Sequence, residues 1–236
     1  ILIGKDTRKS GDMLEAALTA GLCSMGAKVI PLGVVPTPAV AYLTRYYKAD
    51  AGVVISASHN PCEYNGIKFF NSDGYKLSDG IENEIESYIL GEKAIEELPT
   101  HGKVGYVSAN HNAVEDYVAF AVSTIDCRLD GMKIAVDCAN GASYETAFKA
   151  LNKLGANVEA IHNTPDGVNI NHMCGSTHME SLQAYVTSIG ADIGIAFDGD
   201  ADRMLAVDEN GKLIDGDQIM AACAKFMRDN GTLKQN

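Results

Sequence analysis

The sequence lacks three features: a long apolar run, an excess of basic residues, and two cysteines with C-x-x-C spacing. No run approaches the ~18 apolar residues of a membrane-spanning helix, and we therefore expect no membrane partner. Lysine and arginine total 19 against 31 aspartates and glutamates, which gives a formal net charge of -12. This balance argues against nucleic acid or an anionic membrane as the main partner. A few local basic groups can still bind a small anionic substrate.

The cysteines are scattered along the chain: Cys23, Cys62, Cys127, Cys138, Cys174 and Cys223. Their spacing predicts neither a zinc site nor a redox dithiol, and reduced thiols in a cytoplasmic protein are the simplest interpretation. The first residues have no basic segment followed by a long apolar one, which argues against a signal peptide. They also lack methionine and begin inside a predicted strand. We therefore expect the chain to be a piece of a longer protein.

Short apolar runs alternate with segments of helical spacing along most of the chain. Its 236 residues, 46% of them hydrophobic, allow about two domains with sizeable cores. Predicted strands at 2–4, 28–32 and 52–55 alternate with helices, and strands at 133–137 and 157–161 continue the pattern. Such alternation is typical of parallel β-α units. We predict an α/β fold with two consecutive α/β domains, each a mixed, mostly parallel sheet flanked by helices.

A polar, irregular stretch at about 92–108 predicts a linker between these domains. We place the first domain at 1–108 and the second at 109–210. Residues 211–236 would begin a truncated third domain, because a terminal helix by itself has no layer against which to pack.

One predicted strand ends abruptly in the segment Ser56-Ala57-Ser58-His59-Asn60-Pro61. Open α/β sheets bind ligands at the carboxyl ends of their strands, which makes this segment a candidate site. Strand alternation does not decide whether Ser56 or Ser58 is the reactive hydroxyl. His59 is a candidate base, an orienting group, or only a hydrogen-bonding loop residue. The competing interpretation is a simple turn at the Asn-Pro pair, capped by the serines.

A second candidate site is the acidic loop Asp198-Gly199-Asp200-Ala201-Asp202-Arg203. Three neighbouring carboxylates repel one another, and a divalent cation such as Mg²⁺ or Ca²⁺ relieves that repulsion. An EF-hand is excluded for two reasons. Its sixth position requires glycine, but that position here is occupied by Arg203, and the segment before the loop is a predicted strand rather than a helix. A solvated acidic turn is the competing interpretation.

A hydroxyl that accepts a phosphoryl group needs a metal and cationic neighbours. The cationic candidates are Lys68, Arg8 and Arg203. For each of them, the competing interpretation is an ordinary charged residue on the surface. A hydrolase that uses the aspartates as nucleophile and metal site is disfavoured, because the serine segment would then have no role.

Three segments together resemble the α-D-phosphohexomutase superfamily. They are Gly4 to Gly11, with Lys5 where the family has arginine; Ser56 to Pro61 with Asn65-Gly66-Ile67-Lys68; and Asp198 to Arg203, with Ala201 where many relatives have glycine. Within the superfamily, Asn169-Ile170-Asn171 and Cys174 to His178 resemble the phosphoglucosamine mutases.

The resemblance implies specific roles for residues of both sites. It implies that Ser58 is the phosphoserine and that Mg²⁺ is held by Ser58, Asp198, Asp200 and Asp202. It implies catalytic positions for His59, Lys68 and Arg8, and phosphate or loop contacts for Arg8 and Arg203. The roles of Ser176 to His178 stay open.

The implied reaction interconverts glucosamine 6-phosphate and glucosamine 1-phosphate through a 1,6-bisphosphate. In the four-domain fold of the family, the sugar-recognition and substrate-phosphate loops lie in the third and fourth domains, so we expect this chain alone to be an inefficient mutase. The alternatives are a phosphoglucomutase or phosphomannomutase of the same superfamily, and a non-catalytic module that binds metal or phosphosugar. The sequence leaves the oligomeric state open.

Overall fold

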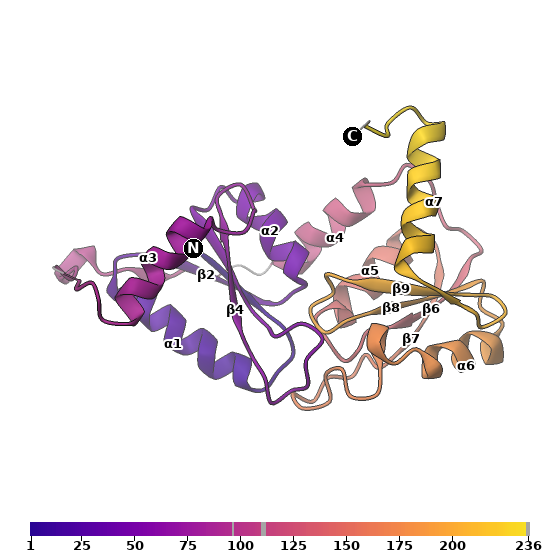
Figure 1. The fold of residues 1–236 in the computed structure, drawn as a ribbon, viewed down its shortest axis with the longest axis horizontal. Helices are drawn as coiled ribbons and strands as arrows, with labels where there is room; N and C mark the ends of the chain where they lie inside the picture. The colour runs from indigo at the N-terminus through magenta and orange to yellow at the C-terminus, as the bar shows by residue number, and fades with distance from the viewer. Residues whose placement is uncertain (96, 110–111, 235–236) are drawn as a thin grey trace.

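A computed structural model describes residues 1–95, 97–109 and 112–234. Residue 96 of the predicted linker, residues 110 and 111 of the predicted second domain and the last two residues of the predicted third-domain segment lie outside the described residues. The described chain forms two five-stranded sheets that lie side by side (Figure 1). This confirms the predicted mixed α/β class.

The first sheet has the strand order β4-β3-β1-β2-β5. Its strands are β1 (Leu2–Lys5), β2 (Lys28–Val34), β3 (Ala51–Ile55), β4 (Ile67–Asn71) and β5 (Tyr106–Val107). The strand β1 pairs in parallel with β2 and β3, β5 pairs in parallel with β2, and β4 runs antiparallel to β3. The short strand β5 lies in the stretch predicted to be irregular, because two residues carry too little pattern to show alternation.

Helices cover both faces of this sheet. On one face, α1 (Ser10–Ser24) packs Leu14 and Leu18 against Ile3 of β1. On the other face, α2 (Thr37–Tyr46) packs against Leu2 and Val54. Neighbouring residues of one strand are therefore buried on opposite faces, which explains why these strands appear as continuous apolar runs in the sequence.

The second sheet has the order β10-β9-β8-β6-β7. Its strands are β6 (Lys133–Asp137), β7 (Asn157–Ile161), β8 (Ile193–Phe197), β9 (Met204–Asp208) and β10 (Leu213–Ile214). Here β6 pairs in parallel with β7 and β8, whereas β9 runs antiparallel to β8. The helix α5 (Ser143–Lys153) covers one face and α6 (Glu180–Ile189) the other. The order β9-β8-β6-β7 thus repeats the order β4-β3-β1-β2 of the first sheet.

The remaining elements join or extend the two units. They are α3 (Asp79–Ile89), η1 (His101–Lys103), α4 (Ala113–Ser123), η2 (Gly175–Thr177) and α7 (Gly216–Asp229). The helix α4 packs on both α2 and α5, and its Phe120 stacks on Tyr42 with ring centroids 3.8 Å apart. The predicted boundary at 108/109 falls between β5 and this bridging helix, and the domain limits stay a prediction.

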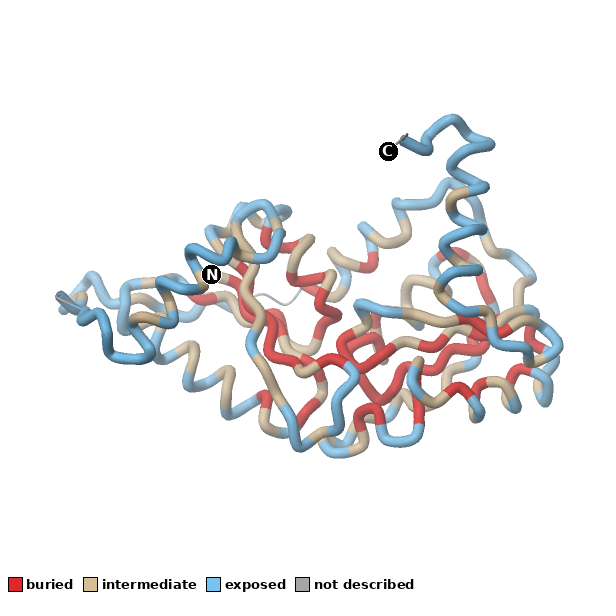
Figure 2. The backbone as a smooth tube through the Cα atoms, viewed as in Figure 1, coloured by how far each residue is buried: buried red, intermediate tan, exposed pale blue. Residues whose placement is uncertain are grey.

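Buried residues lie in the central strands of both sheets and in the loops where the two units meet, whereas α3 and α7 have no buried residues (Figure 2). The helix α7 starts in a capping box formed by Asp215 and Gln218 and extends away from the second sheet (Figure 1). Within the described residues, no helix is long and apolar enough to span a bilayer.

Candidate active site

The serine segment leaves the carboxyl end of β3 and gives its two serines different contacts. The Ser56 hydroxyl donates to Asp6 Oδ2 at 2.6 Å and accepts the Ser58 backbone N–H at 3.0 Å. Ser58 is buried, has the left-handed φ of 52°, and donates from Oγ to Asp198 Oδ2 at 2.7 Å. Of the two serines, therefore, Ser58 faces the acidic loop and Ser56 holds the turn.

Arg8 is buried beneath this segment and contacts its backbone. Its Nε donates to Asp6 Oδ2 at 2.9 Å. The four N–H groups of its two terminal nitrogens reach the carbonyl oxygens of Ser58, Asn60, Pro61 and Tyr64. All five guanidinium N–H groups are thus engaged within the first unit. These contacts match a loop-holding role for Arg8; the catalytic role implied for it stays a prediction.

The acidic loop follows β8, the strand equivalent to β3 in the second sheet. Asp198 and Asp200 are buried and Asp202 is exposed. Ligand oxygens of the three carboxylates lie within 4.8 Å of one another. Asp200 Oδ2 accepts hydrogen bonds from Lys68 Nζ and Thr37 Oγ1, each at 2.7 Å. The other oxygen, Asp200 Oδ1, is buried without a hydrogen-bond partner.

The charges of this loop are unevenly compensated by the protein. Burial raises the pKa of Asp198, and repulsion from Asp200 and Asp202 raises it further. Burial also acts to raise the pKa of Asp200, but the Lys68 ammonium and the Thr37 hydroxyl outweigh it and hold that pKa below its usual value. A buried carboxylate oxygen without a donor is costly, and a divalent cation satisfies it. The cluster is therefore a candidate metal site.

Three further predicted residues, Arg203, His59 and Lys68, lie around Ser58 and the aspartates. Arg203 Nη2 lies 3.4 Å from Ser58 Oγ, and Arg203 Nη1 lies 3.1 Å from His59 Nδ1. Lys68 comes from β4, and its ammonium lies 2.7 Å from Asp200 and 3.9 Å from Asp202. The structure thus brings Ser58, His59, Lys68, Arg203 and the three aspartates into one site. Arg8 lies below it.

Sequence reasoning missed two residues that form hydrogen bonds from one unit to a site loop of the other. Thr37 donates its backbone N–H to Asp200 O at 2.9 Å as well as its hydroxyl to the side chain. In the sequence, Thr37 lies between Pro36 and Pro38, and proline at such a position is typical of a helix start rather than of a site. Asn171 donates from Nδ2 to the carbonyls of Ser58 and Asn60. Its motif was noted as a family resemblance, but no contact could be assigned to it.

A second cluster, Asp137, His162 and Cys174, also brings together groups of metal-ligand type. The Asp137 carboxylate already accepts three hydrogen bonds, from Ala139 N, Gly175 N and His162 Nδ1, each at 2.9 Å. Burial and the charge of Asp137 raise the pKa of Cys174 to about 12, so this thiol stays protonated at neutral pH. This arrangement fits an anchor for the loop between β7 and α6 rather than a metal site.

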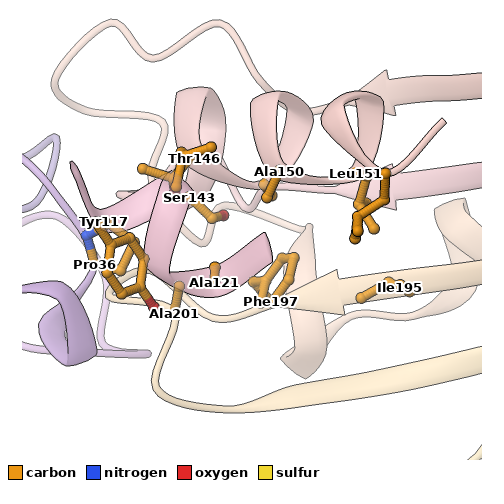
Figure 3. Close-up of a pocket in the computed structure, with 13 residues that line it drawn as sticks. Pro36, Tyr117, Ala121, Ser143, Thr146, Ala150, Leu151, Ile195, Phe197 and Ala201 are labelled. Carbon is orange, nitrogen blue, oxygen red and sulfur yellow. The ribbon is translucent and has the colours of Figure 1, made fainter. Parts of the chain in front are cut away.

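A cavity of about 240 Å³ lies behind the acidic loop, between α4, α5 and β8 (Figure 3). Phe197 and Ala201 contribute to its lining from the second unit, and Pro36 from the first. Its wall is mostly apolar, and a phosphorylated sugar would therefore lose more hydration there than it regains in hydrogen bonds. The chemistry described above lies outside this cavity.

Comparisons with known proteins identify the family of both units. Domain I of the phosphoglucomutase/phosphomannomutase family, an alpha/beta/alpha domain, matches residues 1–96, and domain II matches residues 114–211. The phosphoglucosamine mutases of Ruminiclostridium cellulolyticum and Clostridium novyi are 61% and 62% identical over 236 residues, which are 100% of this chain and 53% of each relative. The chain thus spans about half the length of these curated relatives.

A solved structure gives the same picture. The crystal structure of a phosphoglucomutase/phosphomannomutase family protein from Burkholderia thailandensis matches with a TM-score of 0.81 and 29% identity, over 97% of this chain and 51% of that one. Both α/β units and their strand-end loops are covered by these matches. The chain belongs to the phosphoglucomutase/phosphomannomutase family, with domain I in its first α/β unit and domain II in its second.

Proposed function

We propose that this chain carries the phosphoryl-donor part of a mutase that interconverts glucosamine 6-phosphate and glucosamine 1-phosphate. The observation that carries the proposal is the 2.7 Å contact of Ser58 Oγ with Asp198 inside a cluster of three carboxylates. The choice of glucosamine follows the names of the relatives that are 61% and 62% identical. In this proposal Ser58 carries the phosphoryl group and the substrate is a phosphorylated hexose.

The proposed metal is Mg²⁺, held by Asp198, Asp200 and Asp202 together with the Ser58 oxygen or its phosphate. The donor set is all oxygen, which suits a hard cation, and the unpartnered Asp200 Oδ1 fits a metal ligand. When bound, the metal neutralises charge on the phosphoryl oxygens.

The residues of the chain supply the other requirements of phosphoryl transfer. Arg8 and the turn at Ser56 hold the loop so that the Ser58 oxygen points to the second unit. In transfer, the bond from Ser58 Oγ to phosphorus breaks as a bond forms from phosphorus to a sugar hydroxyl. The hydroxyl proton leaves to a base, and Ser58 Oγ gains a proton.

Three side chains are placed to assist this transfer. Lys68 and His59 are the groups that we assign to proton movement and to stabilising charge on the phosphoryl group. Arg203, 3.4 Å from Ser58 Oγ, stabilises the oxygen on which charge develops. The bisphosphate then turns over, and its other phosphoryl group returns to Ser58 by the same chemistry in reverse.

We further propose that the protein acts in the cytoplasm and that the chain alone is an inefficient mutase. The relatives are about twice as long, and the chain would leave the substrate sugar without part of its binding surface. A phosphoglucomutase or phosphomannomutase specificity is the second candidate, favoured by the name of the matching family domains.

The test is carried out on the protein extended to the length of its relatives. Turnover is measured with the 6-phosphates of glucosamine, glucose and mannose in the presence of Mg²⁺. Intact-mass measurement follows the phosphate on the protein, with Ser58→Ala as the control. We expect glucosamine 6-phosphate to give the highest kcat/KM, and a phosphate-sized mass increment that Ser58→Ala lacks. Turnover without any phosphoprotein, or an increment that persists in Ser58→Ala, contradicts the proposal.

A further inference from the structure

The backbone of the serine segment is held from both units at the same two carbonyl groups. Ser58 O accepts hydrogen bonds from Arg8 Nη2 at 2.9 Å and from Asn171 Nδ2 at 2.8 Å. Asn60 O accepts the same two groups at 2.8 and 3.1 Å. Arg8 belongs to the unit that carries Ser58, whereas Asn171 comes from the long loop between β7 and α6 of the other unit. Arg8 therefore restrains the serine segment within its own unit, whereas Asn171 restrains it relative to the other unit.

The loop of Asn171 is fixed within the second unit, independently of the serine segment. Its beginning and its end are both tied to Asp137, through His162 Nδ1 and Gly175 N. Asn171 itself donates its backbone N–H to Ala139 O at 2.9 Å, and its φ of 57° is left-handed, a region that asparagine tolerates well. The buried Asn171 amide is thus presented by a pre-formed support.

The position of Ser58 depends on such restraint. Ser58 has a φ of 52°, a strained region for a residue other than glycine, which persists only where the surroundings enforce it. Gly199 lies so close that an added Cβ would be 2.6 Å from both Ser58 O and Asn171 Nδ2. Asn171, the Ser58 peptide and the acidic loop are therefore in direct contact where the two units meet.

We propose that Asn171 is a positioning residue for phosphoryl transfer. Asn171 and the three aspartates belong to the second unit, and Asn171 aligns Ser58 Oγ of the first unit with those aspartates. Arg8 gives the serine segment its shape, and Asn171 sets where that segment lies relative to Asp198. The inference rests on the proposed function, because it assigns Asn171 to the transfer step. No contact of Asn171 with substrate is required.

The test uses two variants of the protein extended to the length of its relatives. Asn171→Asp keeps the size and the left-handed backbone but replaces the amide donor with an oxygen that repels both carbonyls. Asn171→Gly removes the amide and suits the positive φ. Asn169→Asp is the matched control: it makes the same charge change in the same loop, and its Nδ2 donates to Thr164 O, away from Ser58.

A displacement of about 1 Å costs roughly 100-fold in rate. We expect kcat to fall about 10- to 100-fold in both Asn171 variants, with KM for glucosamine 6-phosphate within about 3-fold of the wild-type value. Circular dichroism verifies that the variants fold. Phosphorylation of Ser58 by glucosamine 1,6-bisphosphate, followed by intact mass, should slow by the same factor. Asn169→Asp should behave as the wild type in kcat and phosphorylation.

Each outcome decides the matter. Wild-type kcat and phosphorylation rate in folded Asn171→Gly overturn the positioning role and leave the proposed function standing. A higher KM with unchanged kcat also overturns it, because Asn171 would then act in sugar binding. If the wild type itself shows neither turnover nor Ser58 phosphate, the proposed function fails and this inference fails with it.

Discussion

Gly199, between two of the aspartates, offers the sharpest test of how closely the two units approach at the site. A Cβ added there would lie 2.6 Å from Asn171 Nδ2, 2.6 Å from Ser58 O and 2.9 Å from Ile170 Cδ1. Ordinary contacts of a carbon atom are about 3.5–4.0 Å, so Gly199→Ala must separate these groups by about 1 Å. Neither the Ser58 carbonyl nor the buried Asn171 amide is the free end of a flexible side chain.

The stability cost follows from this overpacking. Extra methyl groups in well-packed regions cost about 1–3 kcal/mol. For a chain of this size, 1 kcal/mol lowers Tm by roughly 2–4 °C, which gives an expected fall of about 2–12 °C for Gly199→Ala. Gly80→Ala is the matched control. Gly80 lies in α3 with no atom within 4 Å of an added Cβ, and alanine there should stabilise the helix by about 0.5–1 kcal/mol.

The effect on the site is measured separately from stability. Thermal unfolding of the 236-residue chain, followed by circular dichroism, gives the change in Tm. Intact mass of the full-length protein gives the rate of Ser58 phosphorylation, which should fall by about 100-fold for a 1 Å displacement. Gly199→Ala with wild-type Tm and wild-type phosphorylation rate would refute the close contact between the acidic loop and the serine segment.

Four further predictions concern the individual side chains and the metal. Ser58→Ala should reduce mutase kcat by at least about 10³-fold while leaving circular dichroism unchanged; retained turnover would exclude Ser58 as the phosphoryl carrier. Asp200→Asn should weaken Mg²⁺ binding by at least about 10-fold in calorimetry, since loss of an outer partner alone costs 10- to 100-fold. Adding Mg²⁺ at about 100 times its Kd should stabilise the chain by about 2.7 kcal/mol and raise Tm by roughly 5–10 °C, whereas EDTA should reverse the shift. The hydrogen bond to Asp137 raises the pKa of His162, so NMR titration should place it above the ordinary value of about 6.5 and Asp137→Asn should lower it. Because that pKa is raised by folding, the stabilisation is complete below about pH 6.5 and is lost as pH rises through the folded pKa.

The strands that are covered by helices on both faces of a sheet were predictable from sequence, whereas the short strands at the sheet edges were not. β1, β3 and β6 are buried between helices, β8 is partly buried, and all four appear as uninterrupted apolar runs. β5 and β10 consist of two residues each, at the edges of their sheets, where neither alternation nor burial leaves a pattern. Between β7 and α6 the long loop contains only the single turn η2.

The residues of the candidate site fall into the same two groups. Some have a role that the neighbouring sequence indicates, and others have a role that depends on residues far away in sequence. The spacing of the three aspartates predicts a cation site, because carboxylates so close together in sequence repel one another wherever the loop lies. The choice between Ser56 and Ser58 was hidden because the left-handed φ of Ser58 ends the strand alternation. Asn171 donates to the carbonyl oxygens of Asn60 and Ser58, which are 111 and 113 residues away in sequence. The residues next to Asn171 give no indication of such distant partners.

The repeated strand order explains why one site needs both units. In each sheet the third strand along the chain, β3 or β8, ends in one loop of the candidate site, and the two loops are in contact through Ser58 and Asp198. Thr7 donates to Asn140 O, Lys9 N to Gly167 O, and Thr37 and Lys68 to Asp200, so the junction at the site consists of directed polar contacts.

Each such hydrogen bond contributes only about 1 kcal/mol to stability, but its angular preference fixes orientation in a way that apolar packing does not. The stacking of Tyr42 on Phe120 lies elsewhere, between α2 and α4, and ion pairs from Glu115 to Lys149 and Lys153 join α4 to α5. The molecule therefore separates two tasks: α4 holds the units together, and the polar contacts set the alignment of Ser58 with Asp198. It follows that substitutions in the polar set should change phosphoryl transfer more than they change Tm.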